Sequence, residues 1–93
     1  MPAAVYILTN YTHNVLYVGV TACLARRVHQ HKVKFKEDSF TARYQVDKLV
    51  YYEFHELIID AIGREKMIKK KSRRGKMILI ESMNPEWRDL SKN

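Results

Sequence analysis

The alternation of apolar and polar residues predicts three β-strands. Residues 4–8 and 15–20 are rich in β-branched and aromatic side chains, and residues 9–14 between them are polar turn formers. The two runs therefore predict a β-hairpin. A third aromatic and β-branched run, at residues 48–54, predicts another strand.

Helical spacing characterises three further segments. Residues 22–34 follow Thr21, a residue type that caps helices, and the pattern turns Lys32 toward water. Within residues 56–71, apolar side chains recur at helical intervals. Residues 74–83 form a last helical segment with apolar surface of its own.

Two stretches fall outside these elements. Residues 35–44 are polar and predict a loop with a short helical turn. Asn84 and Pro85 end the last helix, and Trp87 is expected to fold back onto the body of the protein. The order of elements is then ββααβαα, which predicts a single α+β domain over residues 1–93 with a small three-stranded antiparallel sheet flanked by helices.

The charge of the chain favours a polyanionic partner. Seventeen Lys and Arg residues against ten Asp and Glu give a net charge of +7. The alternative is a basic protein whose lysines only keep it monomeric. A single cysteine suits a reducing compartment, no apolar run has membrane-spanning length, and the N-terminus does not resemble a signal peptide. We therefore expect a cytoplasmic protein without membrane contact.

The basic residues are densest near the end of the second long helix. Sequence-independent contacts to phosphates are the natural interpretation, and a solvated helix face is the alternative. The residues expected to bind nucleic acid are Lys69, Lys70, Lys71, Arg73 and Arg74.

Glu65 is an anomaly in the helical pattern. It lies seven residues after Ile58 and three after Ile62, within the apolar stripe. A carboxylate removed from water needs a partner. One interpretation is an ion pair with Lys69, four residues on. The other is a ligand for a hard divalent cation such as Mg²⁺ or Mn²⁺, which accepts one or two carboxylates and keeps waters and phosphate oxygens as its remaining ligands.

Four other side chains could act on a phosphate. Arg27 and His31 are four residues apart, so they project from one helical face. A guanidinium suits a phosphate, and an imidazole exchanges protons near neutrality. Tyr6 and Tyr17 lie on neighbouring hairpin strands and could share a face of the sheet. The alternatives are a solvated basic helix and ordinary strand packing.

The order and spacing of these residues resemble the GIY-YIG nuclease domain over nearly the whole chain. The segments Val5-Tyr6-Ile7 and Tyr17-Val18-Gly19 correspond to its two tyrosine motifs. Arg27 lies eight residues after the glycine, His31 follows four residues later, and Glu65 matches the metal-binding glutamate on the later helix.

The resemblance implies a metal-dependent endonuclease that hydrolyses DNA phosphodiester bonds. Tyr17 would be the general base and His31 would tune or relay its proton. Arg27 would neutralise the phosphate oxygens, and Tyr6 would position the scissile phosphate. Glu65 would hold Mg²⁺ or Mn²⁺ on the same catalytic face.

Two further residues match the family pattern. Gly19 would let a phosphate approach the backbone closely. Asn84 matches an asparagine near the end of the pattern, although Asn84-Pro85 could equally be only a helix stop.

The resemblance is strongest to the small stand-alone bacterial members of the family. It implies a role in DNA repair or recombination, with target choice supplied by the domain itself, an oligomer or a protein partner. The alternative is a non-catalytic nucleic-acid-binding or repair-complex interaction module on the same fold.

Overall fold

Three strands and three helices make up the part of the chain that the structure describes, residues 2–33 and 43–92 of a computed structural model. The elements in chain order are β1 (Ala3–Thr9), β2 (Leu16–Thr21), α1 (Leu24–Lys32), β3 (Lys48–His55), α3 (Ile58–Lys69) and α4 (Arg73–Met83). The predicted α+β architecture is confirmed. Most of the helical turn expected at residues 35–44 lies outside the described residues. None of the helices in these two ranges is both long and apolar enough to cross a membrane.

The sheet is antiparallel throughout, and β1 is its central strand, in the order β2-β1-β3. All seven residues of β1 are buried. A central strand covered on both faces explains why residues 3–8 form an almost unbroken apolar run rather than a strict alternation. Tyr6 pairs with Gly19 on one side and with Tyr52 on the other, so β1 brings the hairpin and β3 into one register.

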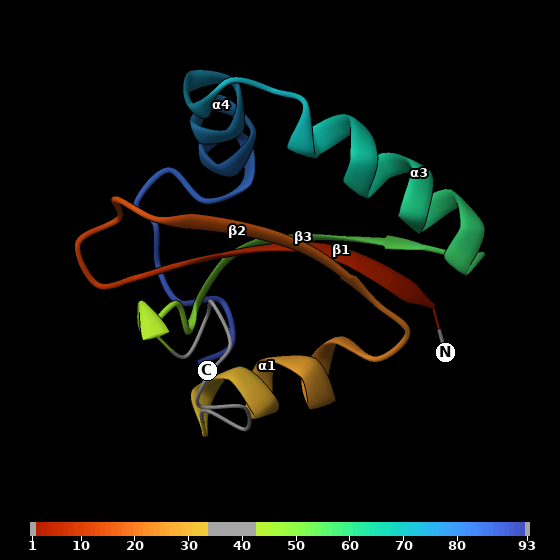
Figure 1. Cartoon of the computed structure of the whole chain (residues 1–93), viewed down its shortest axis with the longest axis horizontal. Helices are drawn as coiled ribbons and strands as arrows, with labels where there is room; N and C mark the ends of the chain where they lie inside the picture. Colours follow the sequence, from red (N-terminus) through yellow and green to blue (C-terminus); the bar gives the residue numbers. More distant parts are fainter. Residues whose placement is uncertain (1, 34–42, 93) are drawn as a thin grey trace.

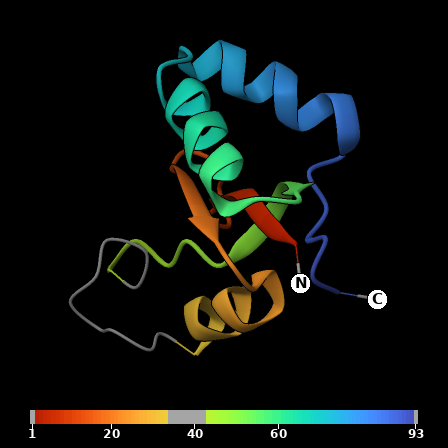
Figure 2. The same ribbon diagram turned by 90° about the vertical axis from the view of Figure 1, so that its right-hand side faces the viewer.

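Helices cover the two faces of the sheet unequally. Figures 1 and 2 show α3 and α4 above the sheet and α1 below it. Alternate residues of β1 therefore enter two cores. Val5 and Ile7 pack with Ile68 and Ile80 from the α3–α4 layer. Tyr6 and Leu8 contact the α1 layer.

The first helix differs from its prediction in two details. Thr21 does not cap it, because Cys23 occupies the N-cap position and the Thr21 hydroxyl instead accepts a hydrogen bond from the Cys23 N–H at 3.1 Å. Lys32 does not turn freely toward water, because its ammonium donates to the Asp89 carboxylate at 2.7 Å and to the Asp47 carbonyl at 2.9 Å. Both contacts depend on the three-dimensional path of the chain, which the spacing of apolar residues does not reveal.

The apolar stripe of α3 is narrower than predicted. Ala61 and Ile68 are fully buried, whereas Ile58 and Ile62 remain 45% and 38% exposed. Glu65 lies between the two buried residues on the covered face.

The C-terminal segment returns to the body of the protein, as predicted. Trp87 is buried in the core, and the Leu90 N–H donates to the Leu49 carbonyl at 2.7 Å. The indole ring of Trp87 stacks on His13 in the β1–β2 turn, with centroids 4.8 Å apart. The tail thus joins β3 to the hairpin turn.

Candidate active site

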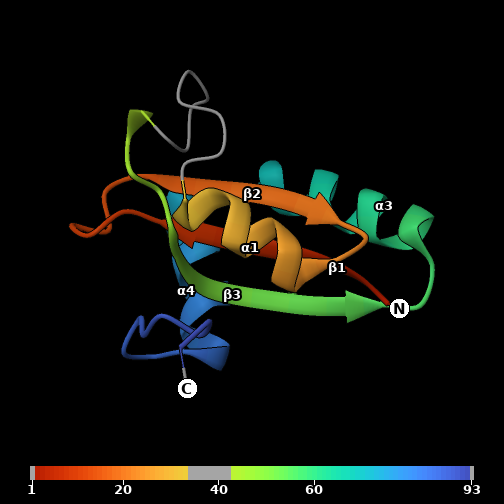
Figure 3. The same cartoon turned by 90° about the horizontal axis from the view of Figure 1, so that it is seen from below.

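The two hairpin tyrosines and the histidine of α1 form one aromatic cluster. The Tyr6 and Tyr17 ring centroids are 6.3 Å apart, and His31 lies 6.2 Å from Tyr6 and 5.7 Å from Tyr17. Figure 3 shows α1 lying across this face of the sheet, between β2 and β3. The structure therefore brings together side chains that are 25 positions apart in the chain.

Gly19 makes room for the buried end of Tyr6. A Cβ atom on Gly19 would lie 2.5 Å from both Cζ and the hydroxyl oxygen of Tyr6, and 3.0 Å from the Tyr17 ring. The space that the glycine leaves is occupied by the phenol of Tyr6. Because Gly19 is also buried, the structure explains this glycine by side-chain packing rather than by access of a phosphate to the backbone.

The Tyr6 hydroxyl is held in its neutral form. Burial raises the pKa of Tyr6 to about 12, the nearby Tyr17 raises it further, and the Arg27 guanidinium partly opposes the rise. The side chain is fully buried. The described residues give its hydroxyl no hydrogen bond of good geometry. Tyr6 therefore retains its proton at neutral pH, and its hydroxyl lies beside Arg27 and Tyr17.

His31 is held in its neutral form as well. Burial lowers the pKa of His31, and the positive charge of Arg27 lowers it further. Arg27 precedes His31 by one helical turn, so the two lie on one face of α1 as predicted. A neutral imidazole 5.7 Å from the Tyr17 ring can accept a proton from that side of the sheet.

Glu65 does not share this face of the sheet, contrary to our expectation. It projects from α3, in the opposite layer. The chain crosses to that layer after β3, and periodicity along the sequence does not reveal which face a later helix covers. Figure 3 shows α3 behind β2, the edge strand, and reaching beyond it. Because α3 contacts both β1 and β2, its layer extends to the β2 edge of the sheet.

The carboxylate of Glu65 is largely covered, and among the described residues it forms an ion pair with Lys69. Its side chain is 13% exposed, and the Lys69 ammonium lies 3.2 Å away with a side chain that is 54% exposed. The predicted ion pair is present. A largely exposed lysine is a weak competitor for a cation, because exposed pairs of this type contribute roughly 0.2–1 kcal/mol.

The residues present fit a cation that needs few protein ligands. Within residues 2–33 and 43–92, no three His, Cys, Asp or Glu side chains gather in a group that could hold a metal ion. Mg²⁺ can be held by a single carboxylate, with waters and substrate phosphate oxygens completing the octahedron. Glu65 is compatible with that arrangement and not with a cage built only from protein ligands.

Asn84 has a structural position. Its side-chain amide donates to the carbonyls of Val50 and Arg88, at 3.1 and 2.8 Å, and its oxygen accepts from the Arg88 N–H at 2.9 Å. Because the buried amide is engaged on both sides, it links α4, β3 and the tail. We therefore assign Asn84 to the fold and leave it out of the candidate site.

Some residues of the predicted basic cluster are exposed to solvent, and others are held in contacts within the described part of the protein. Lys70, Lys71 and Arg74 are exposed, whereas Lys69 pairs with Glu65. Arg73 is committed to the hairpin turn, where it donates to the His13 carbonyl at 2.6 Å and to the Asn14 carbonyl at 3.1 Å. This contact between distant segments has no signal in the sequence.

The structure also contains a polar network on β3 that the sequence patterns did not predict. The Glu53 carboxylate accepts hydrogen bonds from the Tyr51 hydroxyl, from the His55 ring at 2.6 Å and from the Arg64 guanidinium at 3.0 and 3.1 Å. Burial alone would raise the pKa of Glu53, but the hydrogen bonds outweigh it and the pKa is lowered. The spacing of residues 51, 53 and 55 along the strand was the available signal. The network fastens α3 to the sheet next to Glu65.

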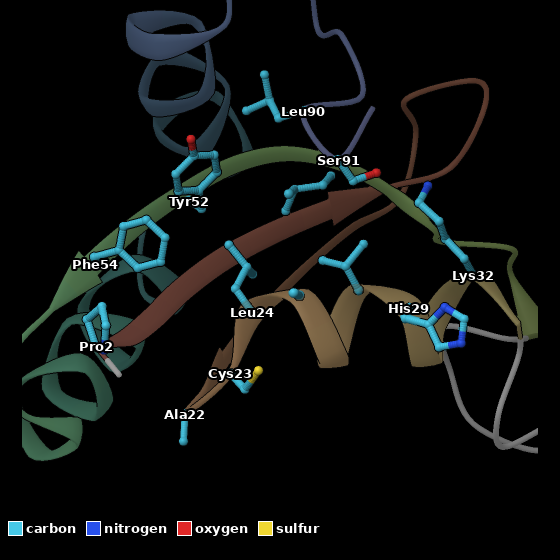
Figure 4. Close-up of a pocket in the computed structure, with 13 residues that line it drawn as sticks. Pro2, Ala22, Cys23, Leu24, His29, Lys32, Tyr52, Phe54, Leu90 and Ser91 are labelled. Carbon is cyan, nitrogen blue, oxygen red and sulfur yellow. The ribbon is translucent and has the colours of Figure 1, made fainter. Parts of the chain in front are cut away.

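An apolar groove of about 600 Å³ runs along the other flank of α1. Figure 4 shows Leu24 of α1 opposite Tyr52 and Phe54 of β3, with Leu90 from the tail at the far side. Phe54 is 55% exposed there. The groove lies away from the polar flank of α1, which carries Arg27.

The protein is a small α+β domain with a three-stranded antiparallel sheet. On one face of the sheet, two tyrosines of the hairpin lie beside an arginine and a histidine of α1. The sequence model of the GIY-YIG catalytic domain family matches residues 2–78 of the 93-residue chain. The chain therefore belongs to this family of nuclease-type domains. No curated protein and no solved structure matches it.

Proposed function

We propose that this protein is a divalent-metal-dependent endonuclease that hydrolyses DNA phosphodiester bonds in repair or recombination. The family supports a nuclease. The observation that carries the proposal for this chain is the cluster of Tyr6, Tyr17 and His31 beside Arg27. The chain's net charge of +7 favours a polyanionic substrate.

Tyr17 is the general base in this proposal. It is less buried than Tyr6 and lies on the edge strand, where a substrate can approach. The neutral imidazole of His31 accepts the phenol proton of Tyr17, and the phenol oxygen takes a proton from the attacking water in its place. Arg27 binds the non-bridging oxygens of the scissile phosphate and neutralises their developing charge.

Tyr6 acts as a positioning residue and does not touch the phosphate, because its side chain is fully buried. Its neutral hydroxyl lies beside Arg27 and Tyr17, and its ring is locked against Gly19. It therefore orients the two groups that reach the substrate.

Glu65 would hold Mg²⁺ or Mn²⁺ in this proposal. The bound cation would supply Lewis-acid stabilisation to the phosphate and the leaving oxygen. Because Glu65 and Tyr17 belong to opposite layers, the substrate phosphate has to bind at the β2 edge, where both can approach it.

The test is cleavage of labelled single-stranded, duplex, flap and junction DNA with Mg²⁺ or Mn²⁺. Tyr17→Phe deletes only a hydroxyl, and we expect it to lower the rate about 10²-fold or more without weakening binding. Tyr11→Phe is the matched control, since Tyr11 is 93% exposed in the hairpin turn. Full activity in Tyr17→Phe would exclude this residue as the base.

The metal site is tested by Glu65→Gln. We expect it to fold, bind DNA and lose cleavage, whereas Glu56→Gln at the exposed start of the same segment stays active. Undiminished cleavage would rule out the metal site. DNA binding by the unsubstituted protein without cleavage of any substrate would favour the non-catalytic module instead.

A further inference from the structure

A small polar recess opens at the beginning of α1, beside the candidate active site. Its volume is about 160 Å³, roughly that of five liquid water molecules. That space accommodates a phosphate group and is too small for a nucleotide. The residues that line it are Thr21, Ala22, Cys23, Arg26, Arg27 and Gln30.

The recess carries positive charge that the described residues leave unneutralised. Arg26 and Arg27 both line it, and the first turn of α1 contains no acidic residue. Arg26 is exposed, and the residues that the structure describes form no ion pair with it. Two guanidinium-bearing residues that line one recess favour an anion there.

The shape of the donors suits a phosphate. Arg26 and Gln30 are four residues apart and share one flank of α1. A guanidinium offers a planar fork of donors, and a primary amide adds two more. Arg27 lines the same recess and also lies beside Tyr6, so the recess adjoins the proposed position of the scissile phosphate.

We propose that this recess is a second phosphate subsite, in which Arg26 and Gln30 bind a phosphodiester flanking the scissile one on the substrate strand. The inference rests on the proposed function, since the scissile position is defined by Arg27 and Tyr17. It assigns to Arg26 and Gln30 substrate binding without a part in the chemical step.

The experiment measures binding of a fluorescent 12-nucleotide DNA, single-stranded and duplex, by anisotropy in EDTA over a range of salt concentrations. We expect Arg26→Gln to weaken binding about tenfold at low salt. It should also lower the slope of log affinity against log salt by roughly 0.7 for single strands or 0.9 for duplex. Arg88→Gln is the matched control, because it removes the same charge from a side chain that is 76% exposed in the tail.

Gln30→Ala separates a built subsite from a diffuse positive field, because it changes no charge. We expect it to weaken binding about threefold and leave the salt slope unaltered. In an Arg26→Gln background, its effect should shrink, since the two side chains bind one phosphate.

Equal effects of Arg26→Gln and Arg88→Gln, or no effect of Gln30→Ala, would overturn the inference, as would failure of both DNA forms to bind. Because the assay contains no metal, it is independent of hydrolysis. A protein that binds as described but never cleaves refutes the proposed function alone. One that cleaves while both variants bind normally refutes the recess alone.

Discussion

The packing of Tyr6 against Gly19 shows how one residue limits the choice at its neighbour. The two are cross-strand partners, and the phenol occupies the volume of a missing side chain. No described glycine has a positive φ, so backbone conformation does not require glycine here. The requirement is steric, and the same contact holds the Tyr6 hydroxyl beside Arg27.

We expect Gly19→Ala to destabilise the protein by about 1–3 kcal/mol, the usual cost of overpacking a core. The added methyl group would meet atoms of Tyr6 at 2.5 Å, and that buried ring cannot move aside cheaply. Chemical denaturation measures the free energy of unfolding. Gly63→Ala is the matched control, because nothing lies within 4 Å of its added Cβ and alanine favours a helix by up to about 1 kcal/mol. Equal stability in the two variants would contradict this account.

At the scale of elements, the attachment of α3 depends on a few polar contacts as well as on its apolar face. The helix has no side-chain cap at its N-terminus, and Ile58 and Ile59 at its start are exposed. The Arg64 guanidinium reaches Glu53 on β3 at 3.0 Å. Since Arg64 precedes Glu65, this contact also helps to set the orientation of the proposed metal ligand.

Glu53→Gln should lower the free energy of unfolding by about 1–3 kcal/mol, since Arg64 and His55 lose a charged acceptor. The pKa of Glu53 is lowered from 4.5 in the folded protein. Its contribution is therefore complete above pH 4.5 and is lost as the pH falls through the folded pKa. The stability difference between the parent protein and the variant should shrink on acidification, as denaturation at several pH values would show. A stability difference that does not change with pH would mean that the variant loses packing or hydrogen-bond geometry rather than the charge of the carboxylate.

Elements were predictable from the sequence where hydrophobic periodicity determines them, and contacts between elements were not. The runs at residues 48–54 and 74–83 became β3 and α4 with small changes at their ends. Periodicity also identified Glu65 as a covered carboxylate. It did not place α3 on the face opposite α1, and it did not reveal the full burial of Tyr6. Both depend on the path of the chain between elements, which local patterns do not encode.

At the scale of the molecule, positive charge occurs in both layers. Lys70, Lys71 and Arg74 lie where α3 meets α4, and Arg26 and Arg27 lie on α1. If the first group touches phosphates, neutralising it should lower the salt slope of DNA binding by roughly two to three units. The triple substitution of Lys70, Lys71 and Arg74 by Gln tests this in the anisotropy assay. An unchanged slope would place the binding surface on α1. Arg73 is excluded from the set because it holds the hairpin turn.

His13 lies where the hairpin turn meets β3, α4 and the tail, and its protonation should affect the stability of that junction. Burial lowers the pKa of His13, and Lys48, whose ammonium is 2.8 Å from the ring nitrogen, lowers it further. Stability should therefore be complete above pH 6.5 and fall as the pH drops toward the folded pKa, because the unfolded chain binds the proton more readily. His13→Asn tolerates the positive φ of 63° and removes the titration. Its melting temperature should depend less on pH between 6.5 and 5 than that of the parent protein, and an identical dependence would contradict this role.

The stacking of Trp87 on His13 also gives the molecule an optical reporter. Trp87 is the single tryptophan of the chain, so all indole emission comes from this contact, where the ring centroids are 4.8 Å apart. Protonation of His13 would place a cation against the indole face at this contact and change the environment of the fluorophore. Emission intensity at constant temperature therefore follows the protonation of His13 in the folded state. A shift of the emission maximum to longer wavelength instead marks release of the tail into water.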